Sequence, residues 1–227
     1  MPSDKALPPA PPAAGPVCVQ YGCGWTAPDG WHNFDASPTL RFERIPLIGK
    51  LYTKNSRRFP ANVMFGDIIR GLPFAENTVD CVYASHVLEH LSYRDCLTAM
   101  RNTYAMMKPG GIFRVIVPDL TWRAAAYLQA AQAGDRGAAL AFMHSTALGL
   151  EERGQGIVRR VIAFFSVSRH LWFWDEAALT DVLLSAGFRS VRRCDYGDAQ
   201  AAAFAMVEDR GRFYEDDHRE LALEAVK

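Results

Sequence analysis

Three short stretches of the chain carry the glycines and side chains needed to bind a nucleoside. Gly22 and Gly24 follow an apolar run, and glycines let a ligand approach the backbone closely. Asp35 ends the next apolar run, where its carboxylate can accept hydrogen bonds from both hydroxyls of a ribose. Asp67 and Ile68 follow a third run, where they can hydrogen-bond to an adenine and flank its ring. Together these residues predict an adenosine site.

The same glycines also match the dinucleotide-binding fingerprint G-x-G-x-x-A over residues 22–27. That fingerprint requires a helix that starts in the glycine loop and holds a pyrophosphate at its N-terminus. Residues 28–30 (Pro-Asp-Gly) interrupt such a helix, and Asp35 lies much nearer than the roughly 20 residues expected in a dinucleotide site. An adenosine ligand without phosphates fits this loop better, and an NAD-dependent oxidoreductase is kept as an alternative.

A second chemical signal is the string His86-Val-Leu-Glu89-His90, which has the H-x-x-E-H form of the inverted zincins. Two histidines four residues apart on a helix can bind zinc. Here the string occupies a short turn between a predicted strand and a predicted helix, and the sequence offers no clear third ligand. Capping and hydrogen bonding around the start of the helix account for Glu89 and His90 more simply. We therefore expect no metal site and keep a zinc hydrolase as an alternative.

The elements that position these residues follow from the apolar runs and their boundaries. Ser92, with Asp95 three residues later, predicts the start of a helix that ends at residues 109–111 (Pro-Gly-Gly). Asp175 and Gly187 predict the start and end of a later helix. Apolar runs bounded by turn residues predict strands at 16–22, 31–37, 61–67, 79–84, 112–119, 188–196 and 221–227, with an irregular connection at 38–60.

Buried strands that alternate with helices predict an α/β fold, a Rossmann-like, mostly parallel twisted sheet with helices on both faces. In such a sheet the ligand lies outside the carboxyl ends of the strands. The residues that end the first five strands should therefore converge on one crevice. These residues are Gly22, Cys23, Gly24, Asp35, Asp67, Ser85, His86 and Asp119.

The chain of 227 residues predicts one domain over residues 16–227, preceded by a disordered Pro/Ala-rich leader at 1–15. Ala-rich residues 121–172 predict a helical insertion over the sheet that forms a substrate lid. A net charge of +0 argues against a nucleic-acid partner, and no apolar run is long enough to predict a membrane span. Five cysteines at irregular spacing, without a C-x-x-C, predict free thiols and a cytoplasmic protein.

Four longer segments resemble a known family in the order of their motifs. VQYGCGWTAPDGWHNFD resembles the first two motifs of class I S-adenosylmethionine-dependent methyltransferases, closest to a type 11-like subgroup with a shortened first crossing. FGDIIRGLPFAENTVDCVYASHVLEHL resembles the third and fourth motifs. MMKPGGIFRVIVPDL and HLWFWDEAALTDVLLSAGFRSV resemble the later KPGG and AGF regions. These matches cover most of residues 16–196.

The resemblance implies S-adenosylmethionine as the cofactor and a role for each matching residue. Asp35 would bind the ribose hydroxyls. The residues implied at the methionine and ribose are Tyr21, Gly22, Cys23 and Gly24, those at the adenine are Gly66, Asp67 and Ile68, and those near the sulfonium are Ser85 and His86. The chain departs from the family at the acid that usually precedes the glycines, because Gln20 and Tyr21 stand there.

Methyl transfer needs an acceptor held in line with the methyl group and, for a hydroxyl acceptor, a general base. His86 and Asp119 are our candidates for that base, ahead of His90 and His170. His90, His170 and Trp172 are also candidate substrate contacts. The subgroup implies a small-molecule or glycan hydroxyl as acceptor. A non-catalytic adenosylmethionine-binding protein of the same fold stays an alternative, and the sequence predicts no oligomeric state.

Overall fold

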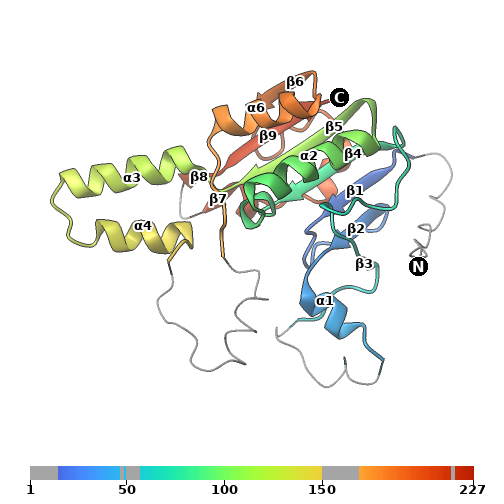
Figure 1. Ribbon diagram of the computed structural model, residues 1–227, viewed down its shortest axis with the longest axis horizontal. Helices are drawn as coiled ribbons and strands as arrows, with labels where there is room; N and C mark the ends of the chain where they lie inside the picture. The colour runs from blue at the N-terminus through green and yellow to red at the C-terminus, as the bar shows by residue number, and fades with distance from the viewer. Residues whose placement is uncertain (1–14, 47–48, 50–56, 150–168, 216–217) are drawn as a thin grey trace.

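The described part of the chain contains a central sheet of seven strands in the order β3-β2-β1-β4-β5-β9-β6. The computed structural model describes residues 15–46, 49, 57–149, 169–215 and 218–227 (Figure 1). The strands are β1 (Cys18–Tyr21), β2 (Trp31–Asp35), β3 (Val63–Phe65), β4 (Val79–Ser85), β5 (Met107–Val117), β6 (Ser190–Arg193) and β9 (Leu221–Val226). All seven predicted strands are confirmed within the predicted ranges, apart from the longer β4 and β5.

The sheet is mostly parallel, as predicted. Strands β3, β2, β1, β4 and β5 pair in parallel, whereas β9 runs antiparallel to both β5 and β6. The crossing from β1 to β2 at residues 22–30, all of which are described, contains no helix. The glycine loop therefore passes directly from one parallel strand to its neighbour, and the shortened first crossing is confirmed.

Helices cover both faces of the sheet. The helical elements are α1 (Pro38–Glu43), η1 (Leu88–His90), α2 (Tyr93–Met106), α3 (Leu120–Gln132), α4 (Ala138–Thr146), α6 (Glu176–Ala186), η2 (Ala202–Met206) and α7 (Arg210–Phe213). Helices α2 and α6 lie side by side on one face (Figure 1), over a core that includes Met100, Leu183 and Phe113. Phe204 of η2 and Phe213 of α7 pack on the other face.

The predicted N-terminal capping residues of the core helices α2 and α6 are correct. The Ser92 hydroxyl accepts a hydrogen bond from the Asp95 backbone N–H at 3.3 Å, and the Asp175 carboxylate accepts one from Ala178 N–H at 2.8 Å. Gly187 ends α6 with a φ of 114°. The predicted stop of α2 at residues 109–111 is wrong, because the helix ends at Met106 and those residues already belong to β5.

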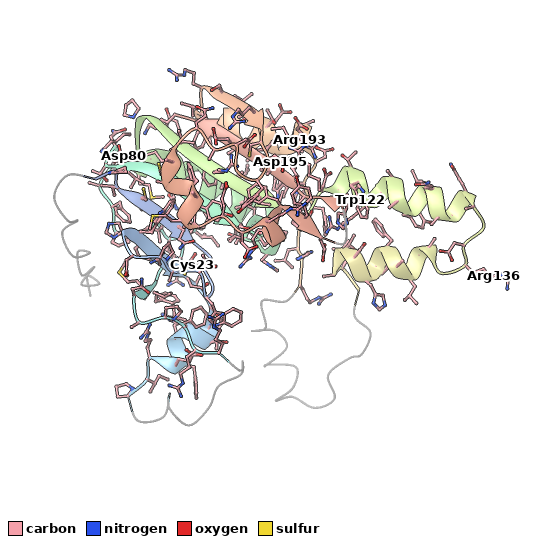
Figure 2. The ribbon with its side chains drawn as sticks, turned by 180° about the vertical axis from the view of Figure 1, so that it is seen from behind. Cys23, Asp80, Trp122, Arg136, Arg193 and Asp195 are labelled. Atoms are coloured by element: carbon pink, nitrogen blue, oxygen red, sulfur yellow. The ribbon has the colours of Figure 1, made fainter. Side chains whose placement is uncertain are left out.

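Two further expectations are corrected. The connection at 38–60 is not wholly irregular, because α1 begins at Pro38, with the Ser37 hydroxyl accepting the Thr39 N–H at 3.1 Å. The described helices of the 121–172 insertion, α3 and α4, form a hairpin that extends beyond the end of the sheet instead of covering it (Figure 1). Figure 2 shows Trp122 at the base of this hairpin and Arg136 at its tip. Residues 150–168 of the insertion, and 1–14 of the leader, lie outside the described residues.

The hairpin is joined to the sheet by buried charges at its base. The Arg123 guanidinium donates to both carboxylate oxygens of Glu220 at 2.9 Å, and to Glu215 of the small ribbon β7 (Tyr214–Glu215) and β8 (His218–Arg219). Arg123 Nε donates to the Ser145 carbonyl at 3.1 Å and so ties α4 to α3. One side chain therefore fixes both helices to the sheet.

All five cysteines are buried and free. Within the described ranges, no helix has the length and apolar character needed to cross a membrane.

Candidate functional site

A pocket of about 340 Å³ opens at the carboxyl ends of β1, β2, β3 and β4, where the sequence predicts the crevice. This volume lies within the usual range of small-molecule sites, about 300–1,000 Å³. The pocket is lined by Tyr21, Gly22, Gly24, Trp25, Asp35, Ala36, Ser37, Phe59, Gly66, Asp67, Ile68, His86, Val87, His90 and Leu91. The end of a parallel sheet thus brings together side chains that are far apart in the sequence.

Asp35 lies at the end of β2, and its carboxylate is held by two backbone donors. Gly24 N–H donates to Oδ2 at 3.0 Å and Ser37 N–H donates to Oδ1 at 2.7 Å. Each oxygen keeps a lone pair for a further donor. Burial raises the pKa of Asp35, although both backbone hydrogen bonds act to lower it. The result is an oriented, largely buried acceptor pair at the pocket wall.

The glycine loop owes its shape to close packing as well as to backbone freedom. Gly22 has a φ of +67°, and a Cβ there would lie 2.2 Å from Val87 Cγ2. Gly24 has a φ of +55°, but nothing lies within 4 Å of where its Cβ would be. Gly22 therefore allows the loop after β4 to pack closely against the glycine loop, whereas the space beside Gly24 is open.

The predicted adenine residues lie together on the pocket wall. Asp67 Oδ1 accepts the Ile69 N–H at 3.0 Å, which orients the carboxylate, and Ile68 is buried. Gly66 permits the packing beneath them, because a Cβ there would lie 2.5 Å from the Phe34 ring. Asp67 and Ile68 can therefore offer the acceptor and the apolar surface that the sequence predicts.

Ser85 and His86 end β4 on different sides of the sheet edge. His86 lines the pocket, whereas Ser85 lines a much smaller cavity with Tyr83 and Arg212. Ser85 Oγ and His86 Nδ1 are 3.0 Å apart, within hydrogen-bond distance. His86 has a φ of 55°, which is uncommon for a residue with a side chain and is found at functional sites. Burial lowers the pKa of His86 to about 4, so the imidazole is neutral at pH 7.

Asp119 does not line the pocket, and its carboxylate is occupied elsewhere. Oδ1 accepts the backbone N–H groups of Thr121 and Trp122 at 2.9 and 3.3 Å, as the N-cap of α3. Oδ2 accepts a hydrogen bond from Arg193 at 2.9 Å. The expectation that Asp119 joins the crevice is wrong, because the chain turns into α3 immediately after β5.

Tyr21 and Cys23 direct their side chains into packing. The Tyr21 hydroxyl lies 3.2 Å from the Thr103 hydroxyl of α2, and Cys23 is buried against Leu40 and Val63. Both residues therefore offer their backbone to a ligand. Gln20, at the place of the family's acid, donates to the Thr26 carbonyl at 2.7 Å and so closes the glycine loop.

Of the three predicted substrate residues, only His90 lines the pocket, and His170 and Trp172 lie beside η1. His90 lines the pocket, and its ring centroid is 5.0 Å from that of His170. Burial lowers the pKa of both histidines. Trp172 does not line the pocket, and its exposed ring packs against Tyr93 with centroids 5.0 Å apart.

Two aromatic side chains of the pocket were missed by the sequence analysis. Trp25 and Phe59 stack with their centroids 6.0 Å apart and form an apolar part of the pocket lining. The position of Trp25 beside Gly24 is a signal that could have been used. Phe59 lies in the long connection after β2, and nothing in its local sequence predicts its place.

Comparison with known proteins identifies the family of the chain. The family described as "Methyltransferase domain" matches residues 21–192. No curated protein matches the chain. Among solved structures, it is similar to an S-adenosylmethionine-dependent methyltransferase from Archaeoglobus fulgidus, at 14% identity and a TM-score of 0.48, covering 93% of this chain and 86% of that one.

It is also similar to a possible histamine N-methyltransferase from Thermotoga maritima, at 15% identity and a TM-score of 0.45, covering 94% of this chain and 83% of that one. The family match spans most of the chain. The chain therefore belongs to the methyltransferase-domain family.

Proposed function

We propose that this methyltransferase holds S-adenosylmethionine in the pocket at the ends of β1 to β4 and methylates a hydroxyl oxygen of a small molecule or glycan. The oriented carboxylate of Asp35 carries the proposal. Its two oxygens are fixed by Gly24 and Ser37 N–H groups, and each retains a lone pair for one ribose hydroxyl. The adenine then extends toward Asp67 and Ile68 and the methionine toward the glycine loop.

His86 is the residue that we assign to proton transfer. In the reaction the bond between sulfur and methyl breaks, a bond between acceptor oxygen and methyl forms, and the sulfonium becomes a neutral thioether. The hydroxyl proton passes to the neutral imidazole of His86, which burial keeps deprotonated at pH 7. Asp119 is assigned instead to the N-terminus of α3, because one of its oxygens caps that helix and the other accepts a hydrogen bond from Arg193 of β6.

The acceptor is assigned to the open side of the pocket near His90. The pocket combines this imidazole with the stacked rings of Trp25 and Phe59. Pockets with a few polar groups on a largely apolar lining are typical of small-molecule sites. An aromatic ring with a nearby hydrogen-bonding group also suits the faces and hydroxyls of a sugar.

The test is calorimetric titration of the purified protein with S-adenosylhomocysteine, with NADH in a parallel cell. We expect micromolar binding of the first ligand and none of the second. Binding of NADH alone would favour the oxidoreductase alternative and overturn the proposal.

Turnover is tested next with a labelled methyl donor and a panel of sugars and small hydroxyl compounds. We expect label in an ether product and a strong loss of turnover, with unchanged S-adenosylhomocysteine affinity, in His86→Ala. Label transferred only to amines would contradict oxygen as the acceptor atom. Turnover by His86→Ala equal to that of the wild-type protein would contradict the assignment of His86 as the base.

A further inference from the structure

Glu89, His90 and His170 bring three metal-ligand atoms together beside the pocket. One carboxylate oxygen and two imidazole nitrogens all lie within 4.8 Å of one another. His90 Nε2 is 3.9 Å from Glu89 Oε1. Glu89 and His90 belong to the H-x-x-E-H string, whereas His170 is distant in the chain and no local pattern links it to them.

Glu89 is a buried carboxylate for which the described residues provide no hydrogen-bond partner. Its side chain is 1% exposed, and neither Oε1 nor Oε2 has a hydrogen-bond partner among them. A buried carboxylate without compensation costs several kcal/mol or becomes protonated, so proteins normally pair it or use it to bind a metal. A bound cation would supply the missing partner.

Both histidines are oriented as metal ligands usually are. His90 Nδ1 lies 3.0 Å from the Arg169 carbonyl oxygen, and His170 Nδ1 lies 2.9 Å from the Thr146 carbonyl oxygen. A carbonyl can only accept, so Nδ1 carries the proton in each ring. Nε2 is then left with its lone pair, and such a backbone contact is the common outer support of a metal-bound histidine.

The backbone fixes the distant ligand to the near one. Leu171 N–H and Trp172 N–H both donate to the Glu89 carbonyl, at 2.6 and 3.2 Å. These bonds hold the residue before them, His170, against η1. The three ligands therefore rest on backbone positions that are held together by hydrogen bonds.

A second group of the same residue types already has a positively charged partner within the protein. Glu215, His218 and Glu220 also place their ligand atoms within 4.8 Å of one another. There, however, the Arg123 guanidinium already donates to both carboxylates. The positive charge that those carboxylates need is present in the protein, whereas Glu89 has no such donor among the described residues.

We propose that Glu89, His90 and His170 form a divalent transition-metal site, with Zn²⁺ as the ion that best fits two imidazoles and one carboxylate. Three protein ligands leave a fourth position open, as in catalytic zinc sites. His90 also lines the pocket, so this position is at the pocket wall. A zinc ion there would lower the pKa of a bound acceptor hydroxyl. That last role rests on the proposed methyl transfer, but metal binding itself does not.

The test is an optical titration of the metal-free protein with Co²⁺, followed by competition with Zn²⁺. We expect one Co²⁺ per chain, with visible bands of a nitrogen- and oxygen-bound ion that disappear when Zn²⁺ is added. His90→Ala, His170→Ala and Glu89→Gln should each weaken binding by at least tenfold. His144→Ala, an exposed histidine on α4 outside the cluster, is the matched control and should leave the affinity unchanged.

Absence of saturable Co²⁺ binding would overturn the proposal. A Co²⁺ affinity of His90→Ala and His170→Ala equal to that of the wild-type protein would also overturn it. If an alanine variant fails to fold, nitrogen NMR of the wild-type protein decides, because two of its six histidines should show metal-bound Nε2 upon Zn²⁺ addition. Shifts confined to other histidines would also overturn it. S-adenosylhomocysteine affinity, measured in parallel, separates failure of the metal site from failure of the cofactor assignment.

Discussion

At the scale of single residues, Asp35 has both a structural and a binding role. Its oxygens fix the glycine loop through Gly24 and the start of α1 through Ser37. Asp35→Ala is expected to weaken S-adenosylhomocysteine binding by more than tenfold, about 1.4 kcal/mol, because charge-assisted hydrogen bonds to the ribose are lost. Calorimetry measures this change. Asp29→Ala, at an exposed turn of the same crossing, is the control, and unchanged affinity in Asp35→Ala would remove the ribose assignment.

The pKa of Asp35 predicts how cofactor binding depends on pH. Burial raises this pKa, so the carboxylate takes up a proton at a higher pH than an ordinary aspartate does. The protonated form cannot accept from both ribose hydroxyls. Affinity should therefore be constant well above this pKa and fall as the pH is lowered through it. Titrations over a pH series check this, and an equally steep fall in Asp35→Asn would show that another group is responsible.

Two glycines of the same loop allow a matched comparison. Gly22→Ala should lower the free energy of unfolding by roughly 2–5 kcal/mol, since the new Cβ meets Val87 and the φ is positive. Gly24→Ala should cost only about 1–2 kcal/mol, from the positive φ alone. Urea denaturation measures both. Equal losses in the two variants would show that the contact with Val87 is unimportant.

At the scale of elements, those with local start and stop signals were predicted well. The α6 helix has both, in Asp175 and Gly187. The α1 helix has Ser37 followed by Pro38, a usable signal that the surrounding loop residues obscured. The elements η2 and α7 were missed because their positions depend on Phe204 and Phe213, which pack on distant strands.

The cap of α6 can be tested directly. Asp175→Ala should lower the free energy of unfolding by about 1 kcal/mol, because the Ala178 N–H loses its acceptor. Asp181→Ala, at an exposed position inside the same helix, should be neutral or slightly stabilising, since alanine favours helices. Chemical denaturation of both variants gives the comparison. A loss in Asp181→Ala as large as in Asp175→Ala would contradict the capping role.

The candidate site shows the same limit on prediction. The ends of parallel strands correctly placed Gly22, Asp35 and His86 around one pocket, because sheet geometry alone brings those ends together. Sheet geometry did not place Ser85 correctly, because neighbouring residues at a strand end point to different sides and Ser85 does not line the pocket. The pairing of Glu89 with His170 depends on how a distant segment docks on η1, and no local pattern reports that contact.

At the scale of the whole molecule, the second face of the sheet is held by a buried charge network. Arg114 on β5 donates to Glu224 on β9 at 2.8 Å and also pairs with Glu208. Arg114→Ala should cost about 3–5 kcal/mol of stability, because it removes the buried guanidinium that pairs with the buried carboxylates of Glu208 and Glu224. Lys108→Ala removes a partly exposed pair with Asp80 and should cost about 1 kcal/mol or less. Denaturant unfolding checks both, and similar small losses would show that the network contributes little.

The hairpin of α3 and α4 has a mechanical consequence for the pocket. Thr146 is the last residue of α4, and its carbonyl holds the ring of His170. The same helix is tied through Ser145 to Arg123 at the hairpin base. Any displacement of α4 therefore withdraws the contact that sets the direction of His170 Nε2. By thermodynamic reciprocity, an ion bound at His170 stabilises the position of the hairpin by the same free energy with which the hairpin strengthens ion binding.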